Sequence, residues 1–287
     1  MSESSYDSIR AAFDPTNVTA WDLSLDGSRL RPKELACAAA ILDWHGIVML
    51  RNYTDRLLVG AAHCEAEAVT ARLEKALAAP ENHGQTGSIF WQIGGARFSG
   101  HRAILAQGQP LANLRSRECG TMNGGVIDLF FLDKAARENG WDALSACCAQ
   151  LQQGAVAEII AAVSRARARQ VNMLRSDSVT STRGLHIDNL EGSYKAFLYL
   201  SDVRGTGDGP YAYVPGSHRR PDLLRREARL NGLKGRPEGD SHAFEGYEMV
   251  FPAEKGTVII SCQSGVHRGL PQRPGASRTV LVGNFRV

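Results

Sequence analysis

The spacing of apolar residues along the chain changes near residue 168. Before that point apolar residues recur at helical spacing in three long segments, 31–46, 55–79 and 140–166. Pro32 and Gly46 mark the ends of the first segment, and Pro80 stops the second. The short apolar run 47–53 predicts a buried strand between them. The first half of the chain is therefore expected to be mostly helical.

Two stretches of this half lack a clear period. Residues 1–30 are polar and rich in turn formers, which indicates a tail or a wrapping arm. Residues 81–126 are rich in glycine and carry the aromatic residues Phe90, Trp91 and Phe98. A long irregular segment of this kind is typical of a lid or a binding loop. We therefore expect residues 31–168 to supply helical support and substrate loops.

After residue 168 short β-prone runs alternate with turn residues. The runs are residues 169–175, 184–188, 194–203, 209–217, 256–262 and 279–287. Short strands at this spacing favour an antiparallel sandwich or a jelly roll. The expected fold is mainly β with flanking α-helices: a jelly-roll, cupin-like core over 169–287 with N-terminal supporting helices. Because the strand near residue 47 needs a sheet to join, residues 1–287 are expected to form a single domain.

Composition narrows the class of partner. The chain has 287 residues, 43% of them hydrophobic, which is enough to bury a large core. Its net charge of +3 argues against a nucleic-acid partner, since such domains carry a strong basic stripe. The densest basic stretch, residues 217–236, is expected to be a solvated loop and short helix, with an anion-attracting rim near a pocket as the alternative.

The cysteines and the N-terminus bear on location. The six cysteines form no CxxC pair and no zinc-finger spacing, so six reduced thiols are expected. The first residues contain no apolar signal core, and we expect no apolar run long enough to span a bilayer. These features predict a cytoplasmic protein without a membrane partner. The N-terminal helices are candidates either to cover the sheet or to mediate a homodimer.

A histidine and an aspartate stand two residues apart in the run 184–188. If this run is a strand, His186 and Asp188 share one face, and Leu185 and Ile187 share the other. By itself the triplet is at least as typical of the solvent-facing side of an amphipathic strand. The alternative is that two metal ligands project side by side from rigid backbone.

A third ligand would decide between these interpretations. Iron(II) in oxygenases is often held by two histidines and one carboxylate, which leaves positions for substrate and oxygen. His218 lies in a tight turn and His242 lies in a polar segment without a strand. His267 lies between two convincing strands, so we select it as the second histidine. Arg278 begins the last strand, from which its guanidinium can point into the barrel and bind a carboxylate at two points.

These residues together carry a family resemblance. The triplet at 186–188, the stretch 209–218, His267 and Arg278 resemble the iron(II)- and 2-oxoglutarate-dependent oxygenases, and most nearly the phytanoyl-CoA dioxygenase-like superfamily. The likeness covers residues 169–287 and the stretch 45–53. It implies a double-stranded β-helix in which His186, Asp188 and His267 hold Fe(II). It also implies that Arg278 binds the distal carboxylate of 2-oxoglutarate, with O2 as co-substrate.

Further residues are candidates for weaker roles. Lys195 on the run 194–203 and Asn172 on the run 169–175 are candidate 2-oxoglutarate contacts. For Lys195, exposure to water is an equal alternative. Arg183 faces either the substrate or the surface. Trp91, Arg97 and His101 are candidate substrate contacts, with packing of that loop on its own barrel as the alternative.

The expected function is hydroxylation of a small organic molecule, in secondary or specialised metabolism, with release of succinate and CO2. Related halogenases lack the carboxylate that Asp188 supplies, so its presence favours hydroxylation. The alternatives are a cupin-like metalloenzyme that does not use 2-oxoglutarate and a non-catalytic binding protein on the same scaffold. Neither alternative requires an arginine beside the metal.

Overall fold

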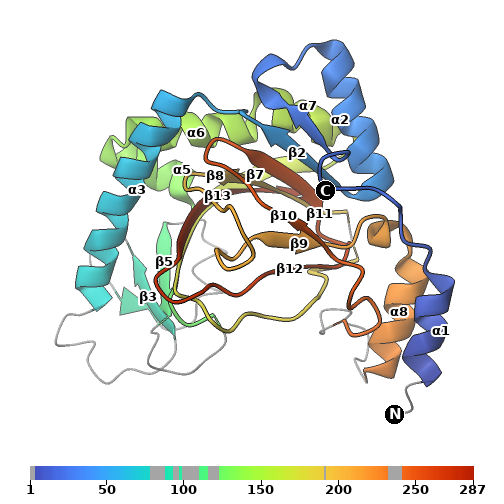
Figure 1. Cartoon of the computed structure of the whole chain (residues 1–287). Coiled ribbons are helices and arrows are strands. Elements are labelled where there is room, and N and C mark those ends of the chain that lie inside the picture. Colours follow the sequence, from blue (N-terminus) through green and yellow to red (C-terminus); the bar gives the residue numbers. More distant parts are fainter. Residues whose placement is uncertain are drawn as a thin grey trace.

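Two β-sheets face each other in the computed structural model, and helices cover the outer side of the larger sheet (Figure 1). The structure describes residues 4–77, 88–92, 97–98, 110–115, 123–190, 192–231 and 241–287. The large sheet is mixed but mostly antiparallel, since among its named pairs only β1 and β2 run parallel. This arrangement is a jelly-roll-like core with helices, as the strand spacing predicts.

Strands from both halves of the chain build the large sheet. Their order is β1-β2-β11-β8-β13-β7-β6-β5-β3-β4. Their bounds are β1 Ser24–Asp26, β2 Ile47–Arg51, β3 Ser88–Gln92, β4 Arg97–Phe98, β5 Leu111–Arg115, β6 Val126–Phe130, β7 Arg167–Asp177, β8 Tyr194–Tyr199, β11 Val258–Cys262 and β13 Ser277–Arg286. The buried run after Gly46 is indeed a strand, and it joins the C-terminal strands through β11.

The small sheet is made of three antiparallel strands, β10 Met249–Phe251, β9 Tyr211–Tyr213 and β12 His267–Gly269. Its apolar side chains pack against the inner face of the large sheet. Tyr213 and Phe251 from the small sheet share a buried cluster with Tyr199, Ile259 and Val280 from the large one. Because alternate residues of a strand face opposite sides, the neighbours of Tyr199, Ile259 and Val280 along the large sheet face the helices instead.

Helices pack on the outer face. Their bounds are α2 Pro32–His45, α3 Arg56–Leu77, α5 Leu132–Asn139, α6 Asp142–Gln152 and α7 Gly154–Val163. Leu42, Leu144 and Ile160 from these helices share the largest buried cluster with Leu198 and Leu281 of the sheet. The helix predicted over 31–46 begins at Pro32 and ends at the left-handed Gly46, as expected.

The segment 140–166 differs from the prediction of one helix. It forms α6 and α7, because Gly154 adopts a φ of 64° and begins a new helix.

Within the described residues, Asp142–Val163 is also long and apolar enough to cross a membrane by length and composition, so the expectation of no such run was wrong. Here Leu144, Leu151 and Ile159 from both helices are buried in the outer core, which favours a packing role.

The prediction of an irregular segment over 81–126 was also wrong in its described parts. Residues 88–92, 97–98 and 111–115 are strands that extend the large sheet beyond β6. Glycine-rich flanks hide these strands in the sequence. They exist because β6 offers an edge to β5, and β5 offers one to β3.

The N-terminal residues wrap around the barrel, as the arm interpretation allows. Helix α1 Ser4–Ala12 packs beside α8 Pro221–Leu230, at the lower right of Figure 1. Ile9 and Phe13 share a third buried cluster with Leu185 and Ile187, which flank His186. The basic stretch therefore includes a short helix, as expected, and its apolar side anchors the segment that carries His186.

Gly46 provides a test of the junction between the helical layer and the small sheet. Its φ is 78°, and a Cβ there would overlap Tyr213 Oη and His218 Nδ1. We expect Gly46→Ala to lower the free energy of unfolding by about 1 kcal/mol for the left-handed backbone and by about 2 kcal/mol more for the overlap. Gly140→Ala is the matched control, because Gly140 has a φ of 66° but open space around it. Equal losses in urea unfolding would contradict this account.

Candidate metal centre

The backbone brings His186 and His267 side by side. His186 N donates to His267 O at 2.9 Å, and His267 N donates to His186 O at 2.8 Å. Residues paired in this way project their side chains on the same side, so the two imidazoles face one direction. The run 184–188 thus forms one isolated β-bridge and is not the full strand that the sequence suggested. Its alternation still holds, since Leu185 and Ile187 are buried.

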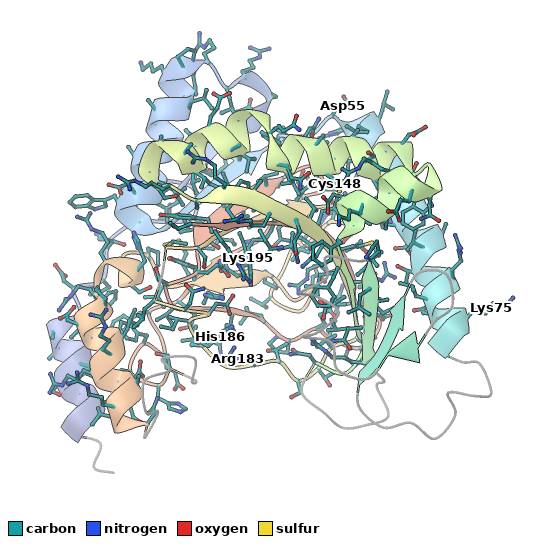
Figure 2. All side chains as sticks on the ribbon, turned by 180° about the vertical axis from the view of Figure 1, so that it is seen from behind. Asp55, Lys75, Cys148, Arg183, His186 and Lys195 are labelled. Carbon is teal, nitrogen blue, oxygen red and sulfur yellow. The ribbon has the colours of Figure 1, made fainter. Side chains whose placement is uncertain are left out.

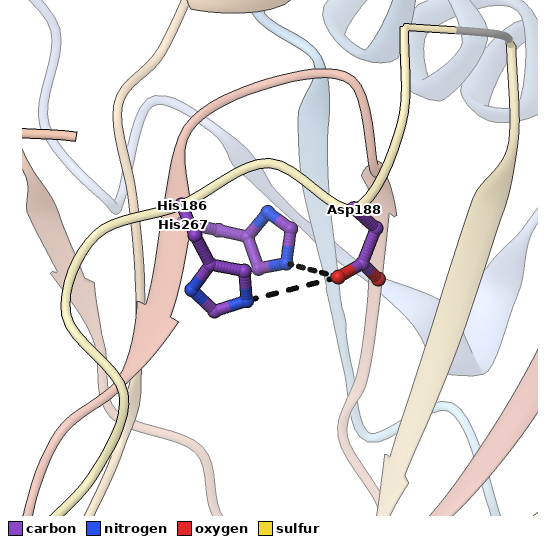
Figure 3. A group of neighbouring side chains, drawn as sticks. All are labelled: His186, Asp188 and His267. Carbon is purple, nitrogen blue, oxygen red and sulfur yellow. Dashed lines mark ion pairs between the residues drawn. The ribbon is translucent and has the colours of Figure 1, made fainter. Parts of the chain in front are cut away.

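Asp188 completes the group. Its Oδ1 lies 3.7 Å from His186 Nε2 and 3.9 Å from His267 Nε2, as the dashed lines in Figure 3 mark. One ligand atom from each of the three residues lies within 4.8 Å of the other two. The structure therefore brings together the three residues selected from the sequence. His218 and His242 lie elsewhere, against Asp43 O and Glu245 respectively.

Hydrogen bonds orient both imidazoles. His186 Nδ1 lies 2.7 Å from Gly184 O, and His267 Nδ1 lies 2.9 Å from Gly265 O. Because a carbonyl only accepts, each Nδ1 carries the proton and each Nε2 presents its lone pair to the centre. Two neutral imidazoles and a carboxylate are the donor set that suits iron(II) with open positions. The residues present thus fit a mononuclear metal.

The protonation states also suit metal binding. Burial lowers the pKa of His267 to about 3 and lowers the pKa of His186 as well. Burial alone would raise the pKa of Asp188, but the net effect, led by the charge and hydrogen bond of Lys195, lowers that pKa below its usual value. At neutral pH the three side chains are therefore two neutral imidazoles and one carboxylate.

Lys195 has a partner that the sequence did not suggest. Its Nζ lies 2.6 Å from Asp188 Oδ2, the carboxylate oxygen that faces away from the histidines. Figure 2 labels Lys195 and His186 near each other, on the inner side of the large sheet and away from its helices. Lys195 therefore holds the aspartate in this structure, and the predicted contact with 2-oxoglutarate remains a prediction.

The three candidate ligands line a cavity of about 380 Å³, called the inner chamber, together with Arg278, Phe197 and Tyr211. Arg278 donates from Nη1 to Gly209 O and from Nη2 to Ser176 Oγ at 3.4 Å. No carboxylate among the described residues pairs with it, and its Nε is buried without a partner. Burial lowers the pKa of Arg278, as expected for a cation removed from water.

The other candidate contacts for co-substrate and substrate line the cavities or lie at the edge of the large sheet. Asn172 lines a second cavity of about 830 Å³, called the outer chamber, and its Oδ1 accepts from Phe131 N and Gln170 Nε2. Arg183 lines both chambers. Trp91 and Arg97 pair through their backbones at the far edge of the large sheet. Their side chains, and all of His101, lie outside the described residues.

Two residues of the site were missed from the sequence. Tyr211 stacks beside His267, with ring centroids 5.7 Å apart, and its hydroxyl shares a hydrogen bond with Ser261. Gln263 is buried, and its backbone oxygen accepts from Asp188 N. The available signal for Gln263 was a polar residue directly after the apolar strand 256–262.

Figure 2 labels Cys148 among the outer helices, and no disulfide joins the five described cysteines.

Comparisons with known proteins identify the fold but not the family. No protein-family model matches the sequence, and no curated protein matches it. The solved structures provide likenesses. The epimerase SnoN, in complex with Fe3+, α-ketoglutarate and nogalamycin RO, aligns with a TM-score of 0.54 at 16% identity over 89% of this chain and 84% of that one.

Two further solved structures align with this chain over a similar length. AviO1 from Streptomyces viridochromogenes Tue57 aligns with a TM-score of 0.54 at 15% identity, over 90% of this chain and 97% of that one. HygX from Streptomyces hygroscopicus, with nickel and 2-oxoglutarate bound, aligns with a TM-score of 0.50 at 16% identity, over 90% and 87%. At these identities the likeness establishes a shared fold over nearly the whole chain.

The histidine pair makes the stability of the metal-free protein depend on pH. With a folded pKa of about 3 and an unfolded pKa of 6.5, His267 binds a proton only in the unfolded chain between these values. Stability is therefore lost as pH falls from 6.5, with a slope of about 1.4 kcal/mol per pH unit from this residue. We expect His267→Gln to remove that share of the slope in urea unfolding, whereas His242→Gln, at an exposed residue, keeps it. An unchanged slope in His267→Gln would refute the assignment.

Proposed function

We propose that this chain is a non-haem iron(II)- and 2-oxoglutarate-dependent dioxygenase that hydroxylates a small organic molecule. Its fold would be the double-stranded β-helix of the phytanoyl-CoA dioxygenase-like superfamily. One observation carries the proposal: the part-buried guanidinium of Arg278, whose Nε is fully buried and which has no carboxylate partner among the described residues, lies in the same chamber as three convergent ligand atoms. An unpaired buried charge is costly, so such a chamber is suited to an anionic ligand. A cytoplasmic location and membership of that superfamily remain predictions.

The neighbours support the cofactors. The SnoN structure holds Fe3+ and α-ketoglutarate, and the HygX structure holds nickel and 2-oxoglutarate, which is the same compound as α-ketoglutarate. The donor set and Arg278 fit both groups in this chain. When bound with O2, iron(II) and 2-oxoglutarate supply oxidation of a C–H bond, coupled to release of succinate and CO2. SnoN, described as an epimerase, indicates that outcomes other than hydroxylation occur on this fold.

The chain's own residues hold and shield the reacting groups. Gly184 O and Gly265 O keep the two imidazoles aimed at the metal. Lys195 occupies Asp188 Oδ2, which leaves Oδ1 for the metal. Arg278 would bind the distal carboxylate of 2-oxoglutarate through its planar fork. The rings of Phe197 and Tyr211 lie against each other and form an apolar wall of the inner chamber, which would keep water from the reacting groups.

The alternative of a cupin-like enzyme independent of 2-oxoglutarate assigns no role to Arg278. Anaerobic titration of the protein with Fe(II) and then 2-oxoglutarate distinguishes the two hypotheses. A weak visible absorption band from the iron–2-oxo acid chelate is expected under the proposal. Turnover of a substrate without 2-oxoglutarate would favour the alternative.

Asp188→Ala tests the metal assignment. Removing the only carboxylate of the group is expected to weaken Fe(II) binding at least about 10-fold and to abolish succinate formation from 2-oxoglutarate. Asp222→Ala is the control, because Asp222 is exposed and pairs with Arg220. Full succinate release by Asp188→Ala would remove the iron assignment.

Arg278→Met tests the anion site separately. Loss of the charge-assisted contacts is expected to raise the Kd for 2-oxoglutarate about 10- to 100-fold, with Fe(II) affinity unchanged. Arg204→Met serves as the control, since Arg204 is exposed and pairs with Asp202. The checks are anaerobic titrations followed at the chelate band, and an unchanged Kd in Arg278→Met would disprove this role.

A further inference from the structure

The outer chamber extends the inner one along the barrel. Asp188, Lys195, Phe197 and Gln263 line both cavities, so the two meet beside the metal ligands. Arg278 lines only the inner chamber. A co-substrate held by Arg278 would therefore leave the outer chamber, of about 830 Å³, for another molecule.

Beyond Arg278 and Ser176, the inner face of the large sheet changes from apolar to polar toward the outer chamber. The registers of β13 with β7 and β8 place inward side chains opposite one another, in rows two residues apart. From Arg278 outward, the rows are Arg278 and Ser176; Tyr199, Val280 and Leu174; Phe197, Val282 and Asn172; and Lys195, Asn284 and Gln170. The outermost row is therefore polar and rich in amides, although Phe130 and Phe285 also line this chamber.

Ion pairs neutralise several of the charges that line the outer chamber. Lys195 pairs with Asp188, and Arg115 pairs with Asp128 at 2.8 Å. Arg183 also lines this chamber, and the exposed Arg286 lies at its rim. The remaining polar lining is largely neutral and offers amide and hydroxyl groups from Gln170, Asn172, Asn189, Ser193, Gln263 and Asn284. Such groups both donate and accept, which suits a ligand with many hydroxyls.

Gln263 holds an unused acceptor at the junction of the chambers. Its side chain is buried, and its Oε1 has no hydrogen-bond partner. Its Nε2 donates to Ser261 Oγ at 2.8 Å and lies 3.3 Å from Ser261 O. A flipped amide would bring Oε1 against that carbonyl, so Nε2 is fixed on Ser261 and Oε1 is left as the acceptor without a partner. A buried acceptor without a partner costs about 1–3 kcal/mol, which a ligand donor would recover.

We propose that the outer chamber binds a hydroxyl-rich substrate, such as a saccharide, cyclitol or sugar acid, with one hydroxyl donating to Gln263 Oε1 beside the metal site. This inference rests on the proposed function and names its substrate class. The opposing class is an acyl chain or acyl-CoA ester, which would leave the amide rows and Gln263 Oε1 unpaired. Unpaired buried polar groups are the main source of discrimination against such a ligand.

The experiment uses the full chain loaded with zinc and 2-oxoglutarate, so that binding is measured without turnover. Isothermal titration then compares glucose, trehalose, raffinose, myo-inositol and gluconate with decanoate and decanoyl-CoA. We expect at least one of the hydroxyl-rich probes to bind, and neither acyl probe to bind. Gluconate is included because Arg183 and Arg286 also line the chamber.

Two variants locate the binding. Gln263→Leu removes the acceptor, and Asn284→Leu removes an amide of the outermost row without touching the inner chamber. Each is expected to weaken the hydroxyl-rich probe at least about 10-fold. The affinity of Asn284→Leu for 2-oxoglutarate is expected to stay within about twofold, since Asn284 lies outside the inner chamber. Asn17→Leu, at an exposed residue, is the matched control.

The outcomes separate this inference from the proposed function. Failure to bind zinc or 2-oxoglutarate counts against the oxygenase itself. With both bound, binding of decanoyl-CoA in preference to every hydroxyl-rich probe overturns the inference alone. Binding of none of the hydroxyl-rich probes, or full affinity in both variants, overturns it equally.

Discussion

The reciprocal backbone bridge between His186 and His267 is the constraint on which the site depends. It ties an irregular segment to the end of β12, and it leaves both imidazoles on one side. Besides this bridge, the segment around His186 has the hydrogen bonds of Leu185 O and Asp188 N and its apolar anchors, Leu185 and Ile187, in the cluster beside α1 and α8. Those anchors set which face of the segment is buried, and the bridge sets its register against the small sheet.

The two sheets supply the rest of the site because their inner faces share one space. The small sheet contributes His267 and Tyr211, while the large sheet contributes Lys195, Phe197 and Arg278. Inward residues on one strand are about 7 Å apart, so Arg278 lies about 20 Å along β13 from the row that contains Lys195. A dicarboxylate near Arg278 and a second molecule near Gln263 would therefore occupy different levels of the same barrel.

The sequence predicts the parts of this structure that depend on local patterns. Helix α2 was predictable because Pro32 and Gly46 mark its ends, and β2 because its apolar run is short and bounded. The strands between residues 88 and 115 were not, because they depend on neighbouring edges and not on their own composition. The break at Gly154 was missed because apolar residues continue across it, and only the backbone conformation interrupts the helix.

In the candidate site, too, local patterns were readable from the sequence and contacts between distant segments were not. The three candidate ligands and Arg278 were identifiable because the triplet at 186–188 alternates as a strand does, His267 lies between two strong strand patterns, and Arg278 begins the last of them. The pairing of Lys195 with Asp188 was not identifiable, since no local pattern predicts which side chains from separate segments meet across the cavity. This pairing matters because it neutralises the lysine within the cavity. Arg278 has no such partner among the described residues and brings positive charge to its end of the inner chamber, whereas the lining of the outer chamber is rich in neutral amides. That gradient predicts the orientation of ligands: an anionic group toward Arg278 and uncharged, hydrogen-bonding groups toward Gln263.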